Sequence, residues 1–130
     1  MILKRIVYPL MLMIVMFSLF FSSSCKHDPM GISQLDTVCF QAQILPILQT
    51  SCGIAGCHDA GGEGGEFTTD SYQTIMSIVT PGSAAKSTLY QVITAVNGQI
   101  MPPKRPLTKD QRTLILVWIE QGANNTTCNP

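Results

Sequence analysis

The sequence predicts an all-α fold, with a single domain of about four short helices. Apolar residues recur at intervals of three and four in several segments after residue 36, which is the spacing of one helix face. Capping residues precede these segments, and glycine or proline follows them. No stretch alternates apolar and polar residues convincingly enough to require a strand. The chain has 130 residues, enough for one domain and not comfortably for two.

Residues 1–24 are expected to form an export signal of the lipoprotein type. Two basic residues precede an apolar stretch, residues 6–21, that is shorter than a comfortable membrane span, and three serines follow. Cys25 comes next, which resembles the cleavage box of bacterial lipoproteins, where the cysteine is lipidated. Ser22 stands where that box usually has a large aliphatic residue, so ordinary secretion is an alternative, and an uncleaved anchor is another. The protein is thus expected in the cell envelope, periplasmic or on the outer surface, with Cys25 as its lipid anchor to a membrane.

Residues 25–35 are expected to be a tether, and residues 36–130 the domain. The tether contains Pro29 and Gly31 and shows no apolar period. From Cys25 onward the chain has six Lys and Arg against eight Asp and Glu, a net charge of −2. This charge is too small and too scattered to indicate nucleic acid as a partner.

The first helix of the domain is expected to lead into Cys52. Ile44, Ile47 and Leu48 stand at helical spacing, with Pro46 among them. A proline inside a helix removes a hydrogen-bond donor and clashes with the preceding turn. The sequence therefore predicts either a kink at Pro46 or a helix that begins there.

The second and third helices are expected to be short. Asp70 with Gln73 resembles a capping pair for a helix that ends at Pro81 and Gly82, and Ser87 is expected to cap the third helix. The apolar residues of these two helices are Tyr72, Ile75, Met76 and Val79 in the second and Leu89, Tyr90, Val92 and Ile93 in the third.

The last helix has the clearest signals at both ends. Thr108 and Gln111 have the spacing of a capping box, and Gly122 ends the helix. Between them lies a broad apolar face made by Leu114, Ile115, Val117, Trp118 and Ile119. Trp118 is expected to be part of the core.

Four cysteines follow Cys25, and an even number in an exported protein usually indicates disulfides. Cys39 and Cys128 lie near opposite ends of the domain, so a bond between them would close a long loop and fix both termini. Free thiols and a different pairing are the alternatives.

Cys52, Cys57 and His58 form a separate motif, C-G-I-A-G-C-H. The shorter form C-x-x-C-H is the attachment signature for haem c, in which both sulfurs bond to the porphyrin and the imidazole binds the iron. Four residues separate the cysteines here, and on a plain helix that spacing would misplace one sulfur. The insert must therefore bulge, and Gly53 and Gly56 allow a looped path. The sequence predicts an expanded haem c motif.

Two alternatives use the same residues. A local disulfide between the two cysteines of the motif would replace the haem. A tetrahedral zinc site would need Cys39 and Cys128, or His27, to converge on the motif, and its adjacent Cys57 and His58 would suit a single zinc ion poorly.

A second iron ligand is expected at Met101. Of the three methionines that follow Cys25, Met30 lies in the tether and Met76 on a helical apolar face, whereas Met101 precedes two prolines. Those prolines forbid a helix and favour an extended residue before them, so Met101 should lie on a stiff, irregular loop. Such a loop suits a thioether that binds a metal; a methionine that fills a gap in the core is the alternative.

These features together resemble a small class I c-type cytochrome. The resemblance rests on the cysteine-histidine motif, the Met-Pro-Pro loop at residues 101–103 and the closing helix at residues 114–123. More narrowly, ILPILQTSCGIAGCHDA, SYQTIM, PGSAAKSTLYQVI and MPP resemble the planctomycete-type cytochrome c domain of bacterial envelope lipoproteins, over about residues 36–123. The resemblance implies a cytochrome c-like domain around one covalently bound haem c, with thioethers on Cys52 and Cys57, His58 as proximal ligand and Met101 as distal ligand.

The expected function is one-electron transfer. Protein ligands on both sides of the iron leave no open position for a substrate, and no paired carboxylates or base-activated serine stand out, so no enzyme activity is expected. The expected partners are redox proteins, a dehydrogenase or an oxidase, that dock transiently. One alternative is an interaction module that is stabilised by disulfides and holds no haem. The other is a haem-based sensor in which a small gas or peroxide replaces Met101.

Overall fold

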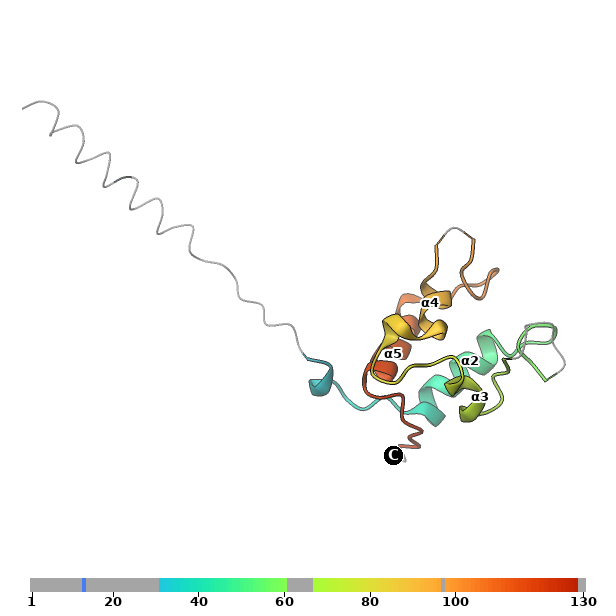
Figure 1. The fold of residues 1–130 in the computed structure, drawn as a ribbon, viewed down its shortest axis with the longest axis horizontal. Helices are drawn as coiled ribbons and strands as arrows, with labels where there is room; N and C mark the ends of the chain where they lie inside the picture. The colour runs from blue at the N-terminus through green and yellow to red at the C-terminus, as the bar shows by residue number, and fades with distance from the viewer. Residues whose placement is uncertain (1–12, 14–30, 61–66, 97, 129–130) are drawn as a thin grey trace, which may run out of the picture. The chain divides into compact units, whose positions relative to one another are not determined.

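The computed structural model describes residues 13, 31–60, 67–96 and 98–128, and in these ranges its regular elements are all helices. In chain order (Figure 1) they are the 3-10 helix η1 (Ile32–Gln34), the π-helix η2 (Phe40–Ile44), α2 (Leu45–Ser51), α3 (Tyr72–Met76), the 3-10 helix η3 (Ala84–Lys86), α4 (Thr88–Thr94) and α5 (Lys109–Glu120). The predicted all-α class, with about four short α-helices, is confirmed for these ranges. No helix in them is long and apolar enough to cross a membrane.

The expected export signal, the lipidation site Cys25 and the first part of the tether lie outside the described residues. The remaining part of the tether contains η1, which begins directly after Gly31. The side chain of Gln34 folds back and accepts a hydrogen bond from the Gly31 N–H at 3.1 Å. This part of the chain therefore forms a local turn instead of remaining fully extended.

An aromatic cluster around Trp118 of α5 forms the centre of the core. Phe40 packs beside Trp118 with 5.4 Å between ring centroids, and Tyr72 meets Phe40 edge-on at 5.0 Å. Trp118 also donates its indole N–H to the carbonyl of Asn124 at 3.0 Å. Buried aliphatic side chains complete the core, contributed by Ile44, Leu48, Ile75, Ile93, Ile115 and Ile119. The prediction that Trp118 belongs to the core is confirmed.

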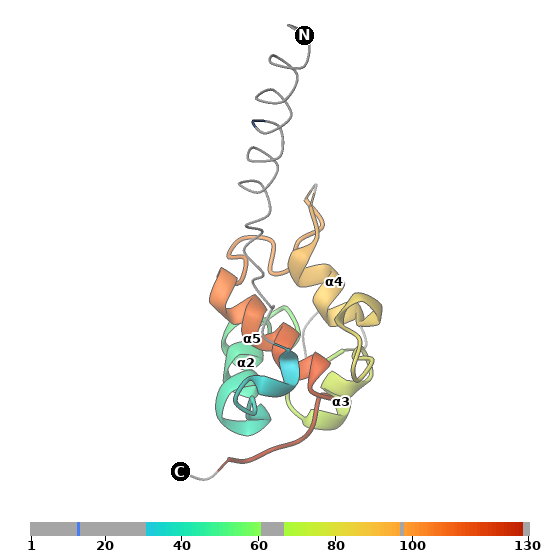
Figure 2. The same ribbon diagram turned by 90° about the vertical axis from the view of Figure 1, so that its left-hand side faces the viewer.

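Helix α5 packs against η2, η3 and α4, and Figure 2 shows it running between α2 and α4. The predicted capping box is present, because Thr108 Oγ1 accepts from the Gln111 N–H at 3.2 Å and Gln111 Oε1 accepts from the Thr108 N–H at 2.9 Å. Gly122, with φ of +99°, follows the helix at the predicted end. A left-handed residue directly after a helix is a common helix stop and favours glycine.

The first predicted helix is two elements. The π-helix η2 runs into α2, and Pro46 stands in the first turn of α2, where the chain passes from the π-helix to the α-helix. The α-helix begins at Leu45, next to Pro46, but the chain is already helical from Phe40, so the predicted start near the proline holds for the α-helix alone.

The cap of α3 differs from the prediction by one residue. Ser71, not Asp70, is the N-cap, and its hydroxyl accepts from the Thr74 N–H at 3.2 Å. Asp70 instead accepts hydrogen bonds from the hydroxyls of Thr68, at 2.7 Å, and Thr74, at 3.1 Å. These bonds favour the charged carboxylate and lower the pKa of Asp70. Helix α3 ends at Met76, so Val79 is not part of it.

Ser87 occupies the predicted N-cap position of α4, but its hydroxyl does not cap the helix. The hydroxyl accepts from the Thr80 N–H at 2.9 Å and lies 2.9 Å from the Ser83 carbonyl and 3.2 Å from the Thr80 carbonyl. The side chain is 0% exposed, so it serves as a buried bridge that holds the turn before α4 closed. The predicted N-cap position is confirmed, but the side-chain capping bond is absent because the hydroxyl accepts from the Thr80 N–H instead.

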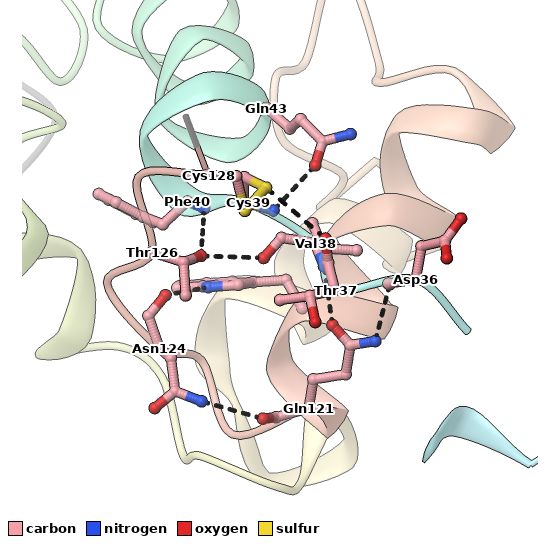
Figure 3. The surroundings of a disulfide bond; sticks show 11 residues. Asp36, Thr37, Val38, Cys39, Phe40, Gln43, Gln121, Asn124, Thr126 and Cys128 are labelled. Atoms are coloured by element: carbon pink, nitrogen blue, oxygen red, sulfur yellow. Dashed lines mark hydrogen bonds between the residues drawn. A yellow bond between two sulfur atoms is a disulfide. The ribbon is translucent and has the colours of Figure 1, made fainter. Parts of the chain in front are cut away.

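The two ends of the domain are joined beside the aromatic cluster (Figure 3). A disulfide links Cys39 to Cys128, which is the expected pair, across 89 residues of sequence. Thr126 pairs with the same segment: its hydroxyl accepts from the Phe40 N–H and donates to the Val38 carbonyl, both at 3.1 Å. The disulfide and the hydrogen bonds of the Thr126 hydroxyl together fasten the last described residues to the start of η2.

Substitution of Ser87 by alanine should lower the free energy of unfolding by about 0.5–1.5 kcal/mol, because it removes the buried hydroxyl that accepts a hydrogen bond from the Thr80 N–H. Chemical denaturation of the purified domain measures this change. Ser83→Ala is the matched control, since the main-chain carbonyl of Ser83, not its side chain, takes part in the bridge. Equal losses in the two variants would contradict the bridging role.

Candidate functional site

The cysteine-histidine motif begins where α2 ends. Cys52 is the C-cap of that helix, and the N–H groups of Cys52 and Gly53 both donate to one carbonyl in α2, at 2.8 and 3.0 Å. The chain then turns back on itself: the Cys57 N–H donates to the Ile54 carbonyl at 2.9 Å, and the His58 N–H donates to the Cys52 carbonyl at 3.1 Å. The extra residues between the cysteines therefore form a closed loop, as the expected bulge requires.

The two glycines of this loop have different roles. Gly56 has φ of +81°, with no atom within 4 Å of where a side chain would begin, so its backbone conformation explains the glycine. Gly53 is not in the left-handed region, but a Cβ there would overlap with Thr69 Oγ1 and lie 3.0 Å from the Gln49 carbonyl. Lack of space explains this glycine.

Both cysteines of the motif are free thiols, so the structure does not contain the local disulfide that was the alternative to haem attachment. Cys52 is 9% exposed, whereas Cys57 is half-buried. Burial, and to a smaller extent the neighbouring Cys57, raises the pKa of the Cys52 thiol to about 11. Cys52 is therefore a protonated thiol at neutral pH.

The His58 imidazole is oriented by a main-chain contact. Its Nδ1 lies 3.1 Å from the carbonyl oxygen of Phe67. A carbonyl can only accept, so this contact requires the proton of the neutral ring to be on Nδ1. Nε2 then carries the free lone pair, which is the state in which a histidine binds a metal.

Residues that the sequence did not single out hold His58 in place. The Thr69 N–H donates to the His58 carbonyl at 3.1 Å, and the Phe67 ring meets the imidazole edge-on with 5.1 Å between centroids. These contacts connect positions nine and eleven residues apart across a glycine-rich segment. No spacing rule links them to the motif, so nothing in the sequence could have identified them.

Met101 lies on an irregular loop between α4 and α5, as expected for the residue before two prolines. Its N–H donates to the Val92 carbonyl at 2.9 Å, its side chain is 41% exposed, and the Met101–Pro102 peptide bond is cis. Among the described residues, no hydrogen bond links this loop to the cysteine-histidine segment, and the two leave the helices at separate points in Figure 1. Met76, by contrast, packs against the core, as expected.

A zinc site has little support from this arrangement. Cys39 and Cys128, two of the additional ligands such a site would need, are bonded to each other. Within the described ranges, no three His, Cys, Asp or Glu side chains gather closely enough to hold a metal ion.

The residues present fit a covalently bound haem c. The motif supplies two thiols that are not bonded to each other and an imidazole whose Nε2 is the free nitrogen. These are the protein groups that haem c attachment uses.

Comparison with known proteins supports the same conclusion. Residues 55–105 match the family model described as Planctomycete cytochrome C, a range that includes Cys57, His58 and Met101. No curated protein and no solved structure matches the chain. The family match confirms the resemblance that the sequence motifs indicate, which is to a planctomycete-type cytochrome c domain.

Proposed function

We propose that this protein is a haem c electron-transfer protein of the bacterial cell envelope. The observation that carries the proposal is the imidazole of His58, which is fixed through Nδ1 beside two free thiols, within a planctomycete-type cytochrome c domain. When bound, the haem iron would supply the chemistry, the uptake and release of one electron.

Each residue of the motif would have a separate role. Cys52 and Cys57 would fasten the porphyrin through thioether bonds, which prevents loss of the cofactor outside the cytoplasm. His58 would bind the iron through Nε2, and the bond from Nδ1 to the Phe67 carbonyl would keep the ring in one orientation and make it a better donor. This orientation is built into the chain and does not depend on the iron.

Met101 would be the second protein ligand to the iron. A thioether ligand raises the reduction potential, and two protein ligands leave no position for a substrate. The protein would therefore be a one-electron shuttle and not an enzyme. Its redox partner would be a dehydrogenase or an oxidase that binds transiently. Lipid on Cys25 would hold the protein to a membrane, at the periplasmic or the outer surface. Nucleic acid would not be a partner.

Expression of the full chain in a host with a haem-attachment apparatus should add the mass of one haem to the intact protein. The haem should remain attached after denaturation, so a denaturing gel should show haem peroxidase staining at the size of the mature chain. A variant with alanine at positions 52 and 57 is the control and should lack both signals. The bare polypeptide as the only product would favour the interaction module that holds no haem.

Replacement of Met101 by alanine should leave the haem attached but remove the sulfur-to-iron charge-transfer absorption of the oxidised protein. It should also lower the reduction potential, since a thioether ligand favours the reduced iron. Absorption spectroscopy and a redox titration measure these changes. Met76→Ala is the matched control, because Met76 packs against the core. Rapid carbon monoxide binding by the unmutated reduced protein would instead favour the sensor.

In the haem-free chain at pH 8, iodoacetamide should modify Cys57 well before Cys52. Cys52 is buried, and its raised pKa keeps its thiolate fraction about 100-fold below that of a thiol at the usual value of 9.0. Peptide mapping by mass spectrometry follows the two sites separately. The rate at Cys52 should rise with pH up to about 11, and denaturant should abolish the difference between the sites. Equal rates in the folded chain would contradict the burial of Cys52.

A further inference from the structure

One short segment, residues 67–69, holds both the ring and the backbone of His58. The Phe67 carbonyl lies 3.1 Å from the ring Nδ1, and the Phe67 side chain stands edge-on to the imidazole. At the other end of the segment, the Thr69 N–H donates to the His58 carbonyl at 3.1 Å. The position of this segment therefore decides where the imidazole lies and which way it faces.

Thr69 also reaches the opposite end of the motif loop. Its side chain is 3% exposed, and its hydroxyl lies 3.5 Å from the His58 carbonyl. The same oxygen occupies the space in which a side chain of Gly53 would begin. Thr69 thus contacts both Gly53, next to the first cysteine, and His58, next to the second.

The expanded spacing gives this contact its importance. A loop with four residues between its cysteines has more conformations to lose than a loop with two, so its path needs additional fixed contacts. Gly53 is not required there for its backbone conformation, in contrast to Gly56. Its lack of a side chain leaves room for Thr69, which would be the nearest neighbour of an added Cβ, and for the Gln49 carbonyl, which would be 3.0 Å away.

We propose that Gly53 and Thr69 form an interlocking pair that positions His58 as an iron ligand, with Phe67 fixing the ring. The iron-binding role rests on the function proposed above. Gly53 and Thr69 are positioning residues, since they act on the imidazole through the loop and through residues 67–69. The pair compensates for the longer insert: it sets the path of the loop where the shorter motif would need no such contact.

Acid titration of the haem-loaded full chain tests the proposal. His58 leaves the iron when its ring takes up one proton, so weaker binding moves this release to higher pH. Loss of an outer contact of a metal ligand typically weakens binding by about 10-fold or more, and a 10-fold loss raises the midpoint by about one pH unit. We expect this rise in Gly53→Ala, because the added methyl group displaces Thr69.

A double-variant cycle separates interlocking from independent effects. Thr69→Ala removes the hydroxyl that the new methyl group would meet, so Gly53→Ala should shift the midpoint much less in that background than in the unmutated chain. Thr126→Val is the control, because its half-buried hydroxyl makes two hydrogen bonds that support the fold far along the sequence from the motif. The proposal would be contradicted if Thr126→Val shifted the titration midpoint as much as Gly53→Ala does. Strictly additive shifts of Gly53→Ala and Thr69→Ala would contradict it as well.

NMR of the haem-free full chain, with its histidines labelled with ¹⁵N, gives a measurement that does not depend on the cofactor. The chain has two histidines, so a His27→Gln variant assigns the signals. Neutral His58 should be protonated on Nδ1 in the unmutated chain and should lose this preference in Gly53→Ala. Absence of haem in the unmutated protein would contradict the proposed function. An unchanged Nδ1 signal in Gly53→Ala would instead contradict the positioning role of Gly53 and Thr69.

Discussion

The contact between Phe40 and Trp118 is the interaction on which the other elements depend. It joins the first helical residue of the domain to its last helix, with both rings almost fully buried and 5.4 Å between their centroids. Tyr72 adds a third ring from the start of α3 and donates its hydroxyl to the carbonyl of Ala123 at 2.9 Å. Three parts of the chain that are distant in sequence are thereby fixed at one point. Large aromatic side chains suit this role, since each buries much apolar surface in a defined geometry.

Two segments of the chain connect the aromatic cluster to the cysteine-histidine motif and so set the position of the motif. Phe40 begins η2, which continues as α2 and ends at Cys52. Tyr72 begins α3, and the chain just before it carries Thr69 to the backbone of His58. The motif loop and the segment that orients its imidazole therefore extend from the same aromatic centre. A change in the core should reach the site through both routes together.

Local signals predicted the parts of the fold that depend on neighbouring residues. The capping box of Thr108 and Gln111, the stop at Gly122 and the bulge after α2 each follow from a few adjacent side chains. The Cys39–Cys128 bond followed from their positions near the two ends of the domain.

Predictions failed where several hydrogen-bond partners competed. The Ser87 hydroxyl accepts from the Thr80 N–H of the preceding turn and not from a helix N–H, and Asp70 accepts from two threonine hydroxyls while Ser71 caps the helix. The contacts of Phe67 and Thr69 with His58 were beyond sequence reasoning for a different reason. They arise only when the chain after the motif folds back on it, and main-chain atoms make two of them.

The disulfide that joins the two ends of the described domain has a mechanical consequence. Gln121 of the segment after α5 holds the chain near residue 36, with its side-chain amide bonded to the Asp36 carbonyl at 3.0 Å and the Val38 N–H at 2.9 Å. A pull on the domain through Gly31 would meet these bonds first and the covalent link at Cys39 next. Part of the tension would then pass into α5 and the last described residues, before the rest reached η2 and α2. A domain strained from its N-terminal side would in this way share the load between its first and last helices.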